Sequence, residues 1–123
     1  MIIPCFNEEG NVKLFYEAAL DTYKNNKKYK LELIFIDDGS RDNTLKELKE
    51  ISKNTDCVIK VISFSRNFGK ESVIYAGLEK ASGDYTVIID ADMQQHPSLT
   101  LPMAEELDKG DYDCVCYFQD KRI

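Results

Sequence analysis

The sequence IIDADMQQHP, residues 88–97, ends an apolar run with two carboxylates one residue apart. In an extended segment residues i and i+2 point the same way, so Asp90 and Asp92 should converge while Ala91 turns aside. Gln94 should continue the same face. Two carboxylates this close repel each other unless a cation is present or one is protonated. All-oxygen ligands in small number are typical of Mg²⁺ or Mn²⁺, so the spacing indicates a divalent cation that bridges a diphosphate.

A second pair with the same spacing, Asp111 and Asp113, provides an internal control. It precedes an apolar run at residues 114–118, whereas Asp90 and Asp92 follow one. In a parallel sheet, groups before and after a strand lie at opposite rims, and ligands bind at the carboxyl-end rim. We therefore interpret the second pair as a polar turn away from the binding rim.

Five short apolar runs alternate with amphipathic helical patterns along the chain. Most runs are continuous, as is typical of parallel strands covered on both faces. The alternation predicts the α/β class, with an open, mostly parallel, Rossmann-like sheet flanked by helices and joined by right-handed crossovers. The expected strands are residues 1–4, 31–36, 57–64, 85–89 and 114–118. The expected helices are residues 12–23, a helix that begins within 40–44 and runs to 51, residues 73–81, and residues 98–109 with Pro102 in the first turn.

Polar segments follow each of the first four apolar runs. Because ligands bind at the carboxyl ends of strands in an open α/β sheet, these segments should form one rim. Patterns of other phosphate sites, such as G-x-G-x-x-G after the first strand or a complete P-loop, are absent. The four segments read PCFNEEGN (4–11), DDGSRDNT (37–44), SRNFGKES (65–72) and DADMQQHP (90–97).

The side chains of this predicted rim suit a nucleotide. Asp37 and Asp38 share one strand end, and Asn7 and Glu8 share a neighbouring one, so both pairs suit hydrogen bonds to a base and a ribose. Lys70, at the start of a predicted helix, suits a phosphate. Together with the carboxylate pair, these residues predict a site for a nucleoside diphosphate and its metal ion.

Composition excludes several function classes. The net charge of −6 argues against a nucleic-acid binder, which would present a basic face. No apolar stretch approaches the roughly 20 residues that span a bilayer, and no signal-peptide pattern follows Met1, so we expect a cytoplasmic location. Four cysteines without a C-x-x-C pair, beside a single histidine, argue against a zinc site and fit a reducing compartment.

In this order and spacing, four segments resemble the family 2 glycosyltransferases of GT-A fold. The segments are IIPCFNEEGN (2–11), IFIDDGSRDNT (34–44), SRNFGKE (65–71) and IIDADMQQHP (88–97), and the likeness covers nearly the whole chain. The chain looks most like the polyprenyl-phosphate sugar transferases, namely dolichyl-phosphate mannosyltransferase and the undecaprenyl-phosphate glucosyltransferases. The resemblance therefore implies the GT-A form of the predicted α/β fold.

The resemblance also implies roles for single residues. Asp90, Asp92 and Gln94 would hold the Mg²⁺ or Mn²⁺ ion, while Asp37 and Asp38 would contact the nucleoside. Gln119 stands where some dolichyl-phosphate members have an arginine. The residues expected to bind nucleotide are Pro4, Phe6, Asn7, Glu8, Asp37, Asp38, Lys70, Asp90 and Ala91.

For a whole enzyme, the resemblance implies inverting transfer of a hexose from a nucleoside-diphosphate sugar to a polyprenyl phosphate, at the cytoplasmic face of a membrane. The chain stops soon after its fifth apolar run, where relatives continue into an acceptor-binding half. We expect residues 1–123 to be the donor-binding part of a truncated enzyme, able to bind donor without transferring sugar. No catalytic residue is assigned, since any base would lie beyond Ile123. Apolar surface near residues 114–118 favours a homo-oligomer.

Several alternatives stay open from the sequence. A receiver-type signalling domain also gathers aspartates and a lysine around Mg²⁺ in an α/β sheet, although its Asp pair should end the first strand. A sugar-nucleotide pyrophosphorylase would need a glycine-rich segment after the first strand. A nucleotide-binding module that docks a partner, and a family 2 transferase acting on a saccharide hydroxyl, would present the same rim as a polyprenyl-phosphate transferase.

Overall fold

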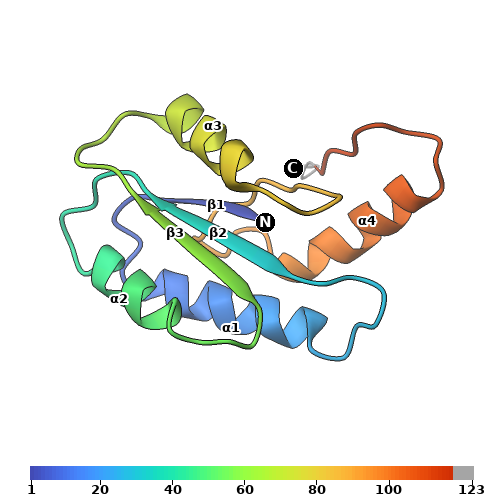
Figure 1. Ribbon diagram of the computed structural model, residues 1–123, viewed down its shortest axis with the longest axis horizontal. Coiled ribbons are helices and arrows are strands. Elements are labelled where there is room, and N and C mark those ends of the chain that lie inside the picture. Colours follow the sequence, from blue (N-terminus) through green and yellow to red (C-terminus); the bar gives the residue numbers. More distant parts are fainter. Residues whose placement is uncertain (118–123) are drawn as a thin grey trace, which may run out of the picture.

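The computed structural model describes residues 1–117, which form a parallel sheet flanked by helices (Figure 1). The predicted helices are confirmed, with the third beginning at residue 70 and the fourth preceded by a 3₁₀ turn. The elements, in chain order, are β1 (Ile2–Cys5), α1 (Asn11–Tyr23), β2 (Glu32–Asp37), α2 (Thr44–Ile51), β3 (Val58–Ser63), α3 (Lys70–Lys80), η1 (Pro97–Leu99) and α4 (Thr100–Asp108).

The strands within the described chain lie in the order β1-β2-β3, all parallel. On the free edge of β1, the segment around Ile88 makes a single parallel bridge to Ile2. The Ile2 N–H donates to the Val87 carbonyl at 2.7 Å, and the Ile89 N–H donates to the Ile2 carbonyl at 3.0 Å. The spatial order is therefore β3, β2, β1 and then residues 87–89. The strands after β1 are added on one side of it and residues 87–89 on the other. This change of side marks the topological switch point, where open α/β sheets bind ligands.

Alternate residues of β1 and β2 feed two apolar clusters, one on each face of the sheet. The helices α1 and α2 cover one face and α3 covers the other (Figure 1). At Gly77 of α3, a Cβ atom would lie 2.6 Å from Cγ2 of Ile2, so only glycine lets α3 approach β1 this closely. The α1/α2 face buries Ile3, Cys5, Leu33 and Phe35 of the strands, and the α3 face buries Ile2, Ile34 and Ile36 against Val73.

Two of the five predicted strands differ from the structure. Residues 85–89 form only the bridge at Ile88, whose side chain stays 43% exposed. Residues 114–117 lie in neither a helix nor a strand, and residue 118 falls outside the described chain, as does Gln119. A strand is stable only when a neighbour completes its ladder, and within residues 1–117 neither segment gains a full partner. The apolar runs were correctly located, but apolarity alone does not supply the pairing.

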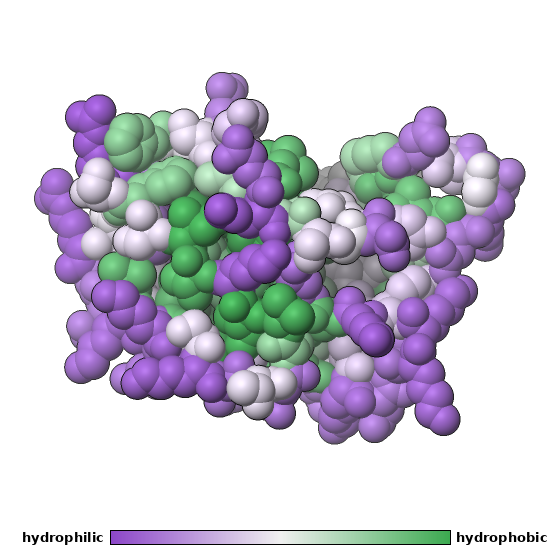
Figure 2. All heavy atoms as spheres, viewed as in Figure 1, coloured by the Kyte–Doolittle hydropathy of each residue, from purple (hydrophilic) through white to green (hydrophobic). Residues whose placement is uncertain are grey.

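The described chain exposes apolar surface in two places. Figure 2 shows apolar atoms gathered over the middle of the face where Figure 1 draws β3, the last strand of the sheet. A hollow of about 1010 Å³ lies between residues 83–89, α4 and residues 113–117. Within residues 1–117, no helix has the length and apolar character needed to cross a bilayer. The expected homo-oligomer stays a prediction.

Candidate functional site

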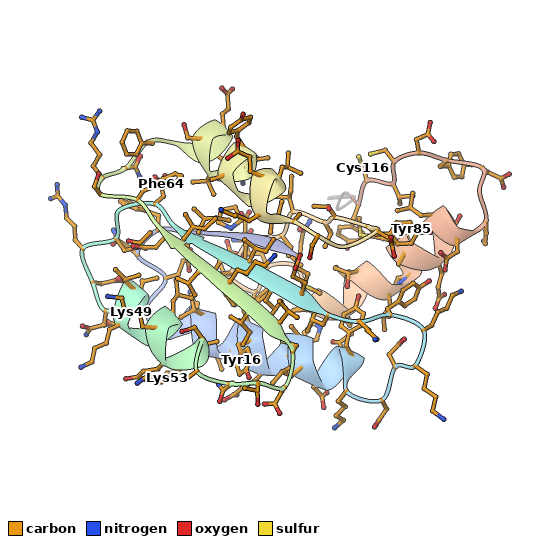
Figure 3. The ribbon with its side chains drawn as sticks, viewed as in Figure 1. Tyr16, Lys49, Lys53, Phe64, Tyr85 and Cys116 are labelled. Carbon is orange, nitrogen blue, oxygen red and sulfur yellow. The ribbon has the colours of Figure 1, made fainter. Side chains whose placement is uncertain are left out.

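A cavity of about 500 Å³ lies at the carboxyl ends of the three strands, where the connections to α1, α2 and α3 begin. Figure 3 labels Phe64 at this end of β3, and Tyr85 beside α4 at the opposite end of the molecule. The predicted rim therefore exists, and it encloses space on the side of β2 and β3. The residues that line it are Phe6, Asn7, Asp37, Gly39, Ser40, Arg41, Leu45, Ser63, Phe64, Ser65, Arg66 and Asn67.

Asp37 is the buried carboxylate of this cavity. It is the last residue of β2, and only 2% of its surface is exposed. Its Oδ1 atom is buried without a hydrogen-bond partner in the described chain. A buried polar atom left unpaired costs about 1–3 kcal/mol, so native proteins rarely keep one without a reason. Because Asp37 also lines the cavity, a small rotation of its carboxylate would let this oxygen accept a hydrogen bond from a ligand.

Asp38, the next residue, is also buried but is fully engaged. Its Oδ1 accepts the Phe68 N–H at 2.8 Å and its Oδ2 accepts the Gly69 N–H at 3.2 Å. Beside it, a Cβ on Gly39 would lie 2.5 Å from the carbonyl carbon of Arg66, and Gly39 has φ +73°. The turn after β2 and the connection after β3 are thus pressed together. Asp38 therefore holds the connection after β3 in place, while Asp37 lines the cavity and keeps one oxygen without a partner in the described chain.

Hydrogen bonds to side-chain oxygens join the connection after β1 to the connection after β2 and to α2. Four successive backbone N–H groups, those of residues 7–10, each donate to a side chain of the second connection or of α2. Four such bonds together fix the loop geometry before any ligand arrives, although only the Glu8–Thr44 bond is partly buried and the other three are exposed. The pairs are Asn7 N–H to Ser40 Oγ at 2.8 Å, Glu8 N–H to Thr44 Oγ1 at 2.8 Å, Glu9 N–H to Asp42 Oδ2 at 3.3 Å, and Gly10 N–H to Glu47 Oε1 at 2.7 Å.

Two side chains that the sequence assigned to the nucleotide also form hydrogen bonds within these connections. Asn7 Oδ1 accepts the Arg41 N–H at 2.9 Å, and Glu8 Oε2 accepts the side-chain N–H of Asn11 at 2.8 Å. Asn7 lines the cavity together with Phe6, which is 45% exposed. Of the predicted nucleotide contacts, Phe6, Asn7 and Asp37 line the cavity, whereas Pro4, Glu8 and Asp38 do not.

The hydrogen bonds between the two connections favour the ionised form of Asp42. Burial alone would raise the pKa of Asp42, but the hydrogen bonds from Thr44 and from the Glu9 N–H outweigh burial and lower it. Asp42 Oδ1 accepts the Thr44 N–H at 2.9 Å, one residue after the Asn43 N-cap of α2. The predicted helix start within residues 40–44 is therefore held by Asp42.

The carboxylate pair follows the bridged segment, on the far side of β1. Ala91 is completely buried while Asp90 and Asp92 are exposed, as the alternation predicts. The chain then turns, because Met93 has φ 65° and the Gln94 N–H donates to Asp92 Oδ1 at 3.1 Å. The extended geometry therefore ends before Gln94, whose exposed side chain is no longer placed by simple alternation.

Lys70 reaches across to this pair. Its Nζ atom lies 3.2 Å from Asp90 Oδ1, although Lys70 begins α3 and Asp90 follows the bridged segment. The sequence predicted that both residues would face one rim, and the structure brings them into contact. The ion pair is exposed to solvent, with 59% of the lysine side chain and 52% of the aspartate side chain accessible.

The donor set at Asp90 and Asp92 suits a divalent ion that keeps other ligands. Within residues 1–117, no group of three or more histidine, cysteine and carboxylate side chains is gathered closely enough to bind a metal alone. Mg²⁺ typically takes one or two protein carboxylates and completes its shell with waters and substrate phosphates. Two exposed carboxylates, one already beside a cation at Lys70, fit that pattern.

The thiol of Cys5 reports the charge at the rim. Burial raises the pKa of Cys5, and the negative charges of Asp37, Glu8 and Asp90 raise it further. Since all three carboxylates act on one buried group at the end of β1, they belong to a single negative region. Such a region attracts a divalent cation, and it repels a diphosphate unless that cation is bound.

Two arginines of the cavity were not singled out from the sequence. Arg41 and Arg66 both line it, and the guanidinium of Arg66 stacks 4.7 Å from the Phe68 ring centroid. Both arginines could have been predicted as cavity residues from their positions in the polar segments 37–44 and 65–72. By contrast, Asp113 of the control pair lines the hollow beside α4, away from this cavity.

Comparison with known proteins agrees with this geometry. A family model described as "Glycosyl transferase family 2" matches residues 1–123. A bactoprenol glucosyl transferase of Shigella phage SfV is 39% identical over 94 residues, which are 76% of this chain and 30% of that protein. The chain spans 30 to 37% of the length of the first curated relatives that it matches.

Two solved structures show the same fold. The first is S. aureus TarS 1–349 in complex with UDP, with a TM-score of 0.68, 20% identity, and coverage of 88% of this chain and 31% of that one. The second is the mannosyltransferase PcManGT of Pyrobaculum calidifontis in complex with GDP-Man and Mn²⁺, with a TM-score of 0.61, 24% identity, and coverage of 73% and 26%. They confirm the predicted GT-A fold.

Proposed function

Because the chain belongs to glycosyl transferase family 2, we propose that its rim binds the nucleoside-diphosphate part of a sugar donor. One observation carries the proposal: Asp37, whose buried Oδ1 has no hydrogen-bond partner within residues 1–117, lines a 500 Å³ cavity at the carboxyl ends of the strands. A nucleobase N–H donated to this oxygen would pair it. Membership of this family argues against the receiver-type and pyrophosphorylase alternatives.

The proposed donor lies along the rim from the cavity to the carboxylate pair. Phe6 contributes an exposed aromatic ring to the cavity lining, and Asp37 contributes an acceptor for the base. The arginines Arg41 and Arg66 add positive charge to a wall that otherwise faces buried carboxylates. The solved complexes of similar fold contain UDP or GDP-Man, which supports a nucleoside-diphosphate sugar as the ligand class.

Asp90 and Asp92, with Gln94 nearby, would hold Mg²⁺ or Mn²⁺ against the diphosphate. When bound, the ion neutralises the charge that grows on the leaving nucleoside diphosphate, the effect that usually dominates such catalysis. The residues of this chain then orient the donor. The hydrogen-bonded connections after β1 and β2 fix the nucleoside end, and the burial of Ala91 leaves both flanking carboxylates facing the rim. The Mn²⁺ in the PcManGT complex supports this ion class.

For the whole enzyme we propose inverting transfer of a hexose to a polyprenyl phosphate at the cytoplasmic face of a membrane. The support is the similarity to the bactoprenol glucosyl transferase. A lipid phosphate is already anionic at neutral pH, so no general base is strictly required for its attack, and we assign none. Residues 1–123 are proposed as the donor-binding part. A transferase of the same family acting on a saccharide hydroxyl would need a base carboxylate.

A thermal-shift screen of nucleoside diphosphates with Mn²⁺ or with a chelator tests the proposal. UDP or GDP at a hundred times its dissociation constant should stabilise the fold by about 2.7 kcal/mol, and only when Mn²⁺ is present. Asp92→Asn should abolish the metal-dependent shift, whereas Asp113→Asn in the control pair should preserve it. Equal shifts with chelator present, or equal losses in the two variants, would contradict the proposal.

A further inference from the structure

The Lys70–Asp90 ion pair joins two parts of the rim that the fold brings together from opposite sides of β1. Lys70 is the first residue of α3, and Asp90 follows the bridged segment at residues 87–89. Their atoms lie 3.2 Å apart, within direct contact of ammonium and carboxylate. An ion pair between groups this exposed contributes little to stability, so a competitor breaks it easily.

The buried carboxylate of Asp38 fixes the backbone that leads into Lys70. Asp38 accepts the N–H groups of Phe68 and Gly69, the two residues that immediately precede Lys70. Gly69 has φ +98°, a conformation that favours glycine and turns the chain into α3. Because the backbone before Lys70 is clamped by a buried carboxylate, the ammonium is delivered to Asp90 by the architecture of the rim.

A divalent cation and an ammonium compete for the same oxygen. Asp90 belongs to the negative region that also contains Asp37 and Glu8, as their common effect on Cys5 shows. A cation bound by Asp90 and Asp92 would repel the Lys70 ammonium from Asp90. Once displaced from Asp90, the ammonium would be available to pair with a diphosphate bound beside the metal, because Lys70 begins α3 next to Asp90.

We propose that Lys70 is the internal counter-ion of the metal site: it neutralises Asp90 before metal binds, and it moves to the diphosphate when metal and nucleotide arrive. The inference rests on the proposed donor site. It assigns one lysine two effects of opposite sign. Lys70 opposes binding of the metal alone, and it favours binding of the diphosphate once the metal is in place. A fixed phosphate ligand would show only the second effect.

Lys70→Met tests both effects in the 123-residue chain. Mn²⁺ binding to the nucleotide-free protein, followed by the electron paramagnetic resonance signal of free Mn²⁺, should tighten about threefold to fivefold. Binding of UDP or GDP at saturating Mn²⁺, followed by calorimetry, should weaken about tenfold, as expected for a lost charge-assisted contact. Lys70→Arg keeps the charge and should restore both values toward those of the unmodified chain.

Lys60→Met is the matched control. Lys60 also forms an ion pair, a partly exposed one 3.0 Å from Glu32, which begins β2 at the opposite end of the strands. It should change neither measurement. If Lys70→Met leaves Mn²⁺ affinity unchanged or weakens it, or if Lys60→Met gives the same changes, the counter-ion role is wrong while the donor site can stand. If the unmodified chain binds Mn²⁺ but neither nucleotide, the proposed function fails, and the Mn²⁺ titration still decides the effect of Lys70 on metal. If the unmodified chain binds no Mn²⁺, both are wrong.

Discussion

The rim has two halves that are held in different ways. The nucleoside half, formed by the connections after β1, β2 and β3, is fixed by hydrogen bonds from backbone N–H groups to buried or half-buried side chains. The metal half, residues 85–95, joins the sheet through one bridge at Ile88, and its carboxylates are held by a local turn and an exposed ion pair. The first half is assembled before any ligand binds, and the second offers charge that a ligand must neutralise.

This difference assigns the two halves different tasks. A preorganised wall loses little conformational freedom on binding, so it suits recognition of a rigid base and ribose. Two exposed carboxylates repel each other and gain most from a cation, so they suit a metal that arrives with the diphosphate. Recognition of the base should therefore depend on the nucleoside half, and the metal requirement should depend on the metal half.

The largest expected effect on the nucleoside half comes from Asp37→Asn. The substitution keeps the shape of the side chain but removes the charged acceptor, so affinity for UDP or GDP with Mn²⁺ should fall by about 10- to 100-fold, the value of a hydrogen bond to a charged group. The free energy of unfolding should not fall, since Oδ1 has no partner in the described chain to lose. Calorimetry and urea denaturation measure the two quantities.

A loss of stability without a loss of affinity would show that Asp37 is a structural residue. The expected contrast with Asp38 is sharp because the two residues are identical in type, adjacent in sequence and both buried. A structural Asp37 would remove the contrast and with it the assignment of the base contact.

The next effect, on stability, comes from Asp38→Asn. An amide has one oxygen for two backbone donors, so the N–H of Phe68 or of Gly69 loses its partner. The free energy of unfolding should fall by about 1.5–3 kcal/mol. Amide hydrogen exchange should accelerate at Phe68 and Gly69 more than at Glu8, whose N–H donates to Thr44. Uniform acceleration at all three amides would indicate global destabilisation instead.

The sequence predicted the nucleoside half of the fold well because its elements are locally encoded. The stripe of apolar residues in α1 and the polar cap before α2 depend on residues close in sequence. The apolar run at 85–89 is equally clear, but a strand also needs a neighbour, and here β1 offers one edge through Ile2 alone. Pairing is a tertiary property, so the pattern located the segment and overestimated its regularity.

The same limit applies to the site. Spacing placed Asp90 and Asp92 on one face, and buried Ala91 confirms that alternation. Spacing did not separate the roles of Asp37 and Asp38, because the difference lies in which loop packs beneath each carboxylate. Nor did it show that the Asn7 side chain is engaged by a backbone N–H from the neighbouring connection. Residue type and strand position predict the rim, and long-range hydrogen bonds decide what each residue does there.

The smallest expected effect concerns a contact away from the rim, between the start of β2 and the turn after α3. Glu32 accepts the Ser82 N–H at 3.1 Å and the Ser82 hydroxyl at 2.6 Å, and it pairs with Lys60. Burial alone would raise the pKa of Glu32, but these hydrogen bonds and the lysine outweigh burial and lower it to about 2. A carboxyl with a depressed pKa in the folded protein stabilises the fold above its unfolded pKa, and this contribution disappears as the pH falls through the folded pKa.

Glu32→Gln should therefore lower the free energy of unfolding by about 1 kcal/mol at pH 7, a small value because Lys60 is partly exposed. The deficit should shrink as the pH falls from 4.5 toward 2, where the native carboxylate also takes a proton. Urea denaturation at pH 7, 4.5 and 2.5 measures it, with Glu106→Gln, from the surface pair with Lys109 in α4, as a control that should change little. A deficit that stays constant across this range would mean that Glu32 acts through packing rather than charge.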